Sequence, residues 1–241
     1  MKKTKFLLFA LSWGISMGLF SACSSEEDNP VVPDLIHTDK TPFGVELIDL
    51  GLPSGTKWAN MTIGATTPEG YGDYFAWGET TGYSTDASDG HLFNFESYKW
   101  HGNMMGALSK YNGNAKGDMK TVLDLEDDAA RENWGGLWVM PTPAEITELL
   151  DNTTSELITV NGINVRRFTS NINGKSIILP RAGYRLDNEL KFCGEYGLYW
   201  SSWVSEDNAV NAQTLYRLQG GPLNGNHPRF YGLQVRAVIR K

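Results

Sequence analysis

The start of a helix at Thr142 is the strongest local constraint that this sequence places on its fold. In "TPAEITELL", Thr142 stands at the capping position, Pro143 takes the first helical position and Glu145 follows three residues after the cap. This combination is a capping box with a proline start, which satisfies free backbone N–H groups of the first turn. The apolar residues that follow recur at helical spacing and form one face: Ile146, Leu149 and Leu150. Upstream, "LEDDAARENW" predicts a second, shorter helix with aspartates at its start.

Most of the remaining chain predicts strands and turns. Within residues 157–168, Asn161 and Gly162 suit the two-residue turn of a β-hairpin, because both residues tolerate positive φ. Further strand-like segments span residues 43–65, 71–79, 174–180, 197–204, 213–218 and 231–240. Residues 80–118 predict a long ordered loop, since they are too rich in aromatic residues for disorder, and such loops often carry function. With 26 glycines for turns, the sequence predicts an α+β fold of twisted antiparallel sheets with one or two helices.

The first residues predict a leader rather than part of the fold. A basic start, "MKKTK", precedes an apolar run that ends in small residues and Cys23. This is the pattern of a lipoprotein signal peptide over residues 1–22, cleaved before a cysteine that then takes lipid. The alternative is a plain secretory signal with a chance cysteine.

Residues 23–41 predict a flexible acidic tether that begins with "CSSEEDNPVVPD". The acidic run resembles the surface-export signal of Bacteroidetes lipoproteins, although a solvated linker facing the periplasm would carry similar residues. We therefore expect a protein anchored by lipid at Cys23 to the outer membrane and exposed at the cell surface.

Two consequences follow from this maturation. If Cys23 carries lipid, Cys193 is the last thiol, so neither an intramolecular disulfide nor a cysteine metal cluster is expected. Cys193 lies among aromatic and apolar residues and is predicted to be buried and inert. The chain has 21 basic and 28 acidic residues, and three lysines leave with the leader, so the remainder has a formal charge of −10. Such a surface repels phosphate backbones, so we expect no nucleic acid as a partner.

Six motifs then appear in a fixed order. They are "LIDLGLPSGTKWANMTIGA", "YGDYFAWGET", "DDAARENWGGLWVMPTPAEITELL", "LPRAGYR", "YWSS" and "YGLQVRAVIR". Together they resemble the Fibrobacter succinogenes major paralogous domain, which is common in Bacteroidetes lipoproteins. The resemblance covers nearly the whole mature chain and implies a single domain over residues 42–241. That domain is similar to the C-type-lectin-like fold of the sulfatase-modifying-factor family, so the resemblance implies that fold with its chain ends close together. The family is better known for its fold than for an activity, and a fold alone does not define a function.

The residues do not predict an enzyme. The sulfatase-modifying relatives that oxidise a cysteine use two cysteines of their own, and here only Cys193 remains. The motifs H-E-x-x-H, G-x-S-x-G and the P-loop do not occur. His91 and His101 could share a metal, but nothing fixes their geometry. The calcium-site tripeptides of C-type lectins are also missing, so we expect neither a metal nor a cofactor. Carboxylates occur in two groups, at residues 126–128 and 206–207, but their sequence does not show the facing pair that a glycosidase requires.

The tryptophans divide into two groups. Those within the family motifs or on predicted strands are expected in the core: Trp58, Trp77, Trp134, Trp138 and Trp200. Trp100 and Trp203 lead into polar loop sequence and are expected nearer the surface.

The segment from Trp203 to Tyr231 is the best candidate for recognition. It combines asparagine, glutamine, arginine, serine and glycine with aromatic residues, a composition typical of binding loops. In lectin-like folds the ligand surface also comes from late strands and loops, and some such proteins have this region diversified by retroelements. The candidate ligand-binding residues are Trp203, Glu206, Asp207, Asn208, Asn211, Gln213, Tyr216, Arg217, Asn224, Asn226, His227 and Arg229. The alternative is an ordinary set of Asn and Gly turns between strands.

These observations predict a non-catalytic surface lipoprotein that recognises an extracellular glycan or protein, in the manner of an adhesin. Two other functions stay open from the sequence. One is a structural component of the cell envelope or of fimbriae, and the other is a carbohydrate-active enzyme that uses acidic residues.

Overall fold

The computed structural model describes residues 34–104, 106–112, 117–216 and 224–241, and these belong to one compact unit, Pro33–Lys241. Cys23 and the predicted leader lie outside the described residues, as does the first part of the tether. Within the described part of the chain, no helix is long and apolar enough to cross a membrane.

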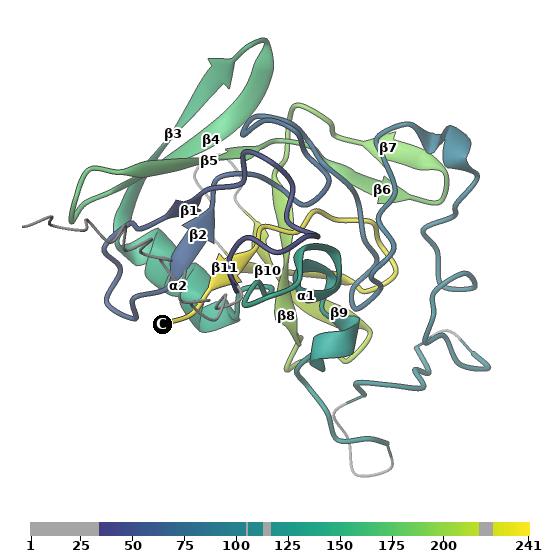
Figure 1. Ribbon diagram of the computed structural model, residues 1–241. Helices are drawn as coiled ribbons and strands as arrows, with labels where there is room; N and C mark the ends of the chain where they lie inside the picture. Colours follow the sequence, from purple (N-terminus) through teal and green to yellow (C-terminus); the bar gives the residue numbers. More distant parts are fainter. Residues whose placement is uncertain (1–33, 105, 113–116, 217–223) are drawn as a thin grey trace, which may run out of the picture. The chain divides into compact units, whose positions relative to one another are not determined.

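The described residues form a mixed α+β fold with antiparallel sheets, as the sequence predicts (Figure 1). One sheet has the order β1-β2-β11 and is made by Leu47–Ile48, Lys57–Ala59 and Val238–Ile239. A second sheet has the order β3-β4-β5 and is made by Thr153–Val160, Ile163–Ser170 and Ser176–Pro180. A two-stranded ribbon pairs β6, Tyr184–Leu186, with β7, Glu189–Lys191. The last sheet has the order β10-β9-β8 and is made by Asn224–Pro228, Asn211–Tyr216 and Leu198–Val204.

The helical part of the described chain is small. It comprises α1, Ala129–Trp134, and α2, Pro143–Asp151, with short 3₁₀ turns at Ala87–Asp89 and Leu125–Asp127. The predicted capping box of α2 is confirmed: the Glu145 N–H donates to Thr142 Oγ1 at 3.2 Å, and Glu145 Oε2 accepts from the Thr142 N–H at 2.7 Å. The predicted apolar face of α2 is buried and packs against the core, with α2 lying next to β8 and β9.

The predicted hairpin at Asn161 and Gly162 is also confirmed. The two residues have φ values of 48° and 83°, which is the left-handed region that a tight two-residue turn requires. The turn joins β3 to β4, which make the long green hairpin at the upper left of Figure 1.

All five tryptophans expected in the core are buried. Two of these indole N–H groups donate to backbone carbonyls far away in the sequence: Trp77 donates to Ser201 O at 2.8 Å, and Trp200 donates to Phe75 O at 2.7 Å. Trp134 and Trp138 pack edge to face with ring centroids 5.1 Å apart. These contacts make the aromatic motifs the framework of the fold.

Two expectations about single side chains are wrong. Trp100 is only 7% exposed, because Gly78 leaves room for its ring: a Cβ on that glycine would lie 2.3 Å from the indole. Cys193 is exposed rather than buried, because it lies in the turn that follows β7, next to the exposed Phe192. In both places the neighbouring residue types indicated the opposite degree of burial.

Candidate functional site

The sheet β10-β9-β8 carries most of the residues that the sequence predicts for binding. Gln213 of β9 lies directly opposite Asn226 of β10, and Ala212 lies opposite His227. Because side chains alternate between the faces of a strand, Gln213 and Asn226 share one face and His227 lies on the other. The register therefore divides the predicted residues between two faces.

Four of the predicted residues line one depression, which we call the polar hollow. It is formed by Glu206, Asp207, Gln213, Gly225 and Asn226 and has a volume of about 240 Å³. Glu206 and Asp207 are exposed and come from the turn between β8 and β9. Three segments of the chain thus bring two carboxylates and two carboxamides together at the surface.

The turn that presents the two carboxylates is held by its own backbone and by Asn208. Asn208 Oδ1 accepts from the Val210 N–H at 3.0 Å, and the Ser205 N–H donates to Asn211 O at 2.9 Å. An irregularity between Trp200 and Val204 shifts the register of β8 against β9 next to this turn. Asn208 therefore shapes the turn, as the alternative interpretation of the asparagines expects, and does not line the polar hollow.

His227 and Arg229 belong to the interior side of the sheet. His227 Nδ1 lies 3.2 Å from Thr214 Oγ1, and burial lowers the pKa of His227 to about 4. Arg229 has no exposed surface, and its guanidinium donates to Tyr98 Oη at 2.9 Å and to Tyr111 O at 3.0 Å. These two side chains support the sheet from within instead of meeting the polar hollow.

The remaining predicted residues lie around this sheet. Trp203 is half-buried, and its backbone forms a bridge with Val122. The backbones of Tyr216 and Asn224 pair at the ends of β9 and β10, but their side chains lie outside the described residues. Arg217 lies outside the described residues altogether.

An acidic cluster elsewhere has the composition of a cation site. Carboxylate oxygens of Asp124, Glu126 and Asp127 lie within 4.8 Å of one another. Lysines already neutralise this cluster, since Lys99 Nζ lies 2.9 Å from Asp127 Oδ1 and Lys120 Nζ lies 2.6 Å from Asp124 Oδ2, while Asp127 also pairs with Lys110. The bond from Lys120 lowers the pKa of Asp124 to about 2. The cluster is an ion-pair network that ties the long loop to the start of α1.

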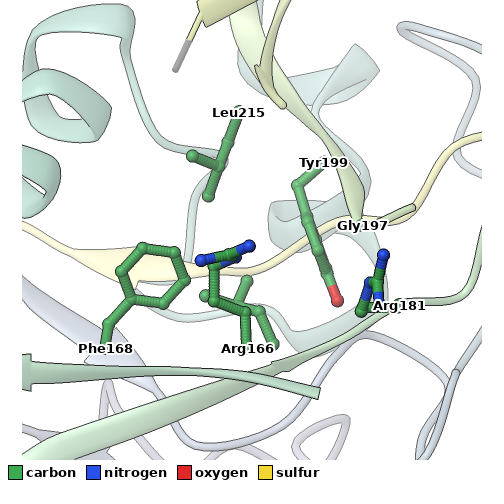
Figure 2. A pocket seen from close by; sticks show the side chains of 7 residues that line it. Arg166, Phe168, Arg181, Gly197, Tyr199 and Leu215 are labelled. Carbon is green, nitrogen blue, oxygen red and sulfur yellow. The ribbon is translucent and has the colours of Figure 1, made fainter. Parts of the chain in front are cut away.

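A narrow apolar gap separates the β4–β5 hairpin from β8 and β9. Figure 2 shows Phe168, Leu215 and Tyr199 around it, with the guanidinium groups of Arg166 and Arg181 beside them. The gap offers about 20 Å³, which is room for a single water molecule rather than for an organic ligand. Tyr199 Oη donates a hydrogen bond to Pro180 O at 2.7 Å, so this gap is part of the packing between the sheets.

No family model, curated protein or solved structure matches this chain. The assignment of a function therefore depends on the geometry and chemistry of its own surface.

Proposed function

We propose that this protein is a non-catalytic lipoprotein of the cell surface that binds an extracellular glycan or protein through the polar hollow. The observation that carries this proposal is the convergence of Glu206, Asp207, Gln213 and Asn226, which come from separate segments, on one exposed depression. A surface of unrelated turns would scatter these side chains. The depression sits on a paired sheet, so its shape is set before any ligand arrives.

The chemistry of the polar hollow suits a ligand rich in hydroxyl or basic groups. The carboxylates accept hydrogen bonds only, whereas the carboxamides of Gln213 and Asn226 both donate and accept. Gln213 Nε2 donates to Val204 O at 3.4 Å. Gln213 Oε1 accepts no hydrogen bond from the described residues and can accept one from a ligand. Two negative charges also attract lysine or arginine side chains of a protein partner.

Membrane attachment through lipid on Cys23 belongs to the same proposal. The sequence pattern of the leader supports it, and the acidic residues after Cys23 favour the outer face of the outer membrane. The tether ends before the predicted boundary at residue 41, because Ile36 O accepts from Trp138 Nε1 at 2.6 Å and Thr41 Oγ1 donates to Trp134 O at 3.0 Å.

We also propose that the fold is C-type-lectin-like. The pairing of β2 with both β1 and β11 supports this, because it joins the beginning and the end of the domain in one sheet. The small helical content beside antiparallel sheets supports it as well.

Replacing the two carboxylates tests the proposed site. The double variant Glu206→Gln, Asp207→Asn of the full chain is expected to bind its ligand at least about tenfold more weakly, since each lost charge-assisted hydrogen bond is worth about 1.5–3 kcal/mol. The measurement is binding of the wild type and variant to a glycan array and to an array of extracellular host proteins. Asp151→Asn, at the exposed end of α2, is the matched control and should bind like the wild type. Equal binding by the double variant and the wild type would remove the polar hollow from consideration.

A further inference from the structure

A second polar pocket lies on a different part of the surface, and we call it the Tyr83 pocket. It has a volume of about 340 Å³, near the lower end of the range of about 300–1,000 Å³ for small-molecule sites. Its lining comes from residues 79–83 and 91–99: Glu79, Thr80, Thr81, Tyr83, His91, Ser97 and Lys99. It shares no residue with the polar hollow.

One wall of the Tyr83 pocket is a pair of stacked aromatic rings. The rings of Tyr83 and His91 are nearly parallel, with an interplanar angle of 11° and centroids 3.7 Å apart. The buried Phe93 packs edge-on against both rings. Both residues of the pair are half-buried and line the pocket, so part of each side chain is accessible to a ligand.

A fully buried arginine holds this wall in place. Arg185 donates to both carboxylate oxygens of Asp89, at 2.6 and 3.0 Å, and to the backbone carbonyl of His91 at 3.2 Å. Tyr83 is fixed at the other end by two backbone hydrogen bonds with Tyr74, of 2.8 and 3.0 Å. The loop between Tyr83 and His91 is therefore anchored on both sides, which preorganises the aromatic pair.

The polar side of the pocket carries groups that can form further hydrogen bonds. Glu79 is half-buried, and its Oε1 accepts from the Lys99 N–H at 2.8 Å. Within the described part of the chain, its other oxygen accepts no hydrogen bond, and the hydroxyls of Thr80 and Thr81 make none. One oxygen of Glu79 and the hydroxyls of two lining threonines thus have no hydrogen-bond partner among the described residues.

The lining of the pocket offers few free charges to a ligand. Lys99 lines the pocket, but its Nζ is paired with Asp127 Oδ1 at 2.9 Å. Burial lowers the pKa of His91, which keeps its imidazole neutral at pH 7. Burial also raises the pKa of Glu79, because it disfavours the charged form of this carboxyl.

We propose that the Tyr83 pocket binds one neutral sugar ring of a glycan, stacked on the Tyr83–His91 pair and hydrogen-bonded to Glu79. A pyranose has an apolar face that packs on an aromatic ring and a rim of hydroxyls that donate to carboxylates and threonine oxygens. A single ring also matches the size of the pocket. This site is independent of the polar hollow, and either one can exist without the other.

Saturation-transfer NMR on the full chain tests this site. The probes are the methyl pyranosides of glucose, galactose, mannose and N-acetylglucosamine. We expect transfer to at least one of them, with Glu79→Gln and His91→Ala each weakening its binding by about tenfold, the change that follows from losing one strong contact. Tyr83→Leu removes the stacking surface and should not bind the sugar, whereas Asp151→Asn, at the exposed end of α2, should bind like the wild type. Thermal unfolding of every variant checks that its fold is retained.

Three results would overturn the proposal. One is the lack of transfer to any of the pyranosides, and another is unchanged binding in both Glu79→Gln and His91→Ala. The third is binding of methylammonium in place of the sugars, which would make the pocket a cation site. Glu206→Gln serves as the control for the other site: if it alone abolished transfer, the sugar would occupy the polar hollow, which would refute this proposal and favour the function proposed above.

Discussion

Arg229→Met is expected to lower the free energy of unfolding by about 3–5 kcal/mol, because each buried carbonyl left without a donor costs about 1–3 kcal/mol. The side chain is fully buried, and its guanidinium donates to three backbone carbonyls, those of Lys110, Tyr111 and Ala209. Methionine fills much of the space but donates no hydrogen bond, so all three carbonyls would be left without this donor inside the fold. Urea unfolding followed by tryptophan fluorescence measures the loss.

Arg229 also packs against aromatic rings of the long loop, which provides a second measurement. Its guanidinium carbon lies 4.6 Å from the centroid of Trp77 and 5.4 Å from that of Tyr98. Limited proteolysis of Arg229→Met should therefore cut between residues 94 and 112 earlier than in the wild type. Arg229→Lys keeps the charge but not the planar guanidinium, so its rate of cleavage should lie between those of Arg229→Met and the wild type.

The matched control for this prediction is Arg167→Met. Arg167 makes a close pair with Glu156 on the exposed β3–β4 hairpin, with Arg167 Nη2 2.6 Å from Glu156 Oε1. Exposed pairs of this kind contribute about 0–1 kcal/mol. If Arg229→Met lost no more stability than Arg167→Met, the guanidinium would not hold the long loop to the sheet.

Buried arginines hold the described residues between β2 and α1, which contain little regular structure, against the rest of the fold. Arg185 binds the backbone of Ser84 and His91, and Arg229 binds that of Lys110 and Tyr111. Arg236 donates to Ala59 O at 3.1 Å and to Ile178 O at 2.9 Å. Arg185 and Arg229 thus satisfy backbone carbonyls of the segment between β2 and α1, whereas Arg236 links β2 to β5.

Features set by short-range chemistry were predictable from the sequence. The capping box at Thr142 and the Asn161-Gly162 turn each depend on a few adjacent residues, and both are present. The burial of the tryptophans was predictable where they lie within the sequence motifs. The prediction failed at Trp100, whose burial depends on the distant Gly78.

The candidate sites were likewise predictable only where they depend on residues close together in the sequence. The composition around Glu206 and Asp207 indicated a recognition segment, and both residues do line the polar hollow. Which face a residue takes depends on register, however, and the irregularity between Trp200 and Val204 has no signature in the sequence. The prediction therefore grouped Arg229 with residues of the opposite face. The Tyr83 pocket was missed because Arg185, almost a hundred residues later, brings its aromatic pair into place.

Asp128→Ala is expected to lower the free energy of unfolding by about 3 kcal/mol at pH 7. Asp128 is 3% exposed, and its carboxylate accepts from the backbone N–H groups of Ala130 and Arg131 at the start of α1. It also accepts from the Met140 N–H, at 2.9 and 3.1 Å to its two oxygens. Alanine leaves these three donors without an acceptor, and each buried unsatisfied group costs about 1–3 kcal/mol. Glu132→Ala, on the exposed face of the same helix, should change stability by no more than about 0.5 kcal/mol, and an equal loss in both variants would contradict the prediction.

The pH dependence of Asp128→Asn separates the charge of Asp128 from its hydrogen bonds. Asparagine keeps the oxygen that accepts from Ala130 and Arg131 but does not titrate. Burial raises the pKa of Asp128 from 3.8 to about 6, so the folded protein holds this proton more tightly than the unfolded chain does. The stabilisation that comes from this bound proton is therefore full below about pH 4 and is lost as the pH rises through about 6. Relative to Asp128→Asn, the free energy of unfolding of the wild type should fall by up to about 3 kcal/mol between pH 4 and pH 7. Urea unfolding of both proteins across this range measures the difference, and a difference that stayed constant or rose with pH would show that the carboxylate is stabilised in its charged form by the three N–H donors.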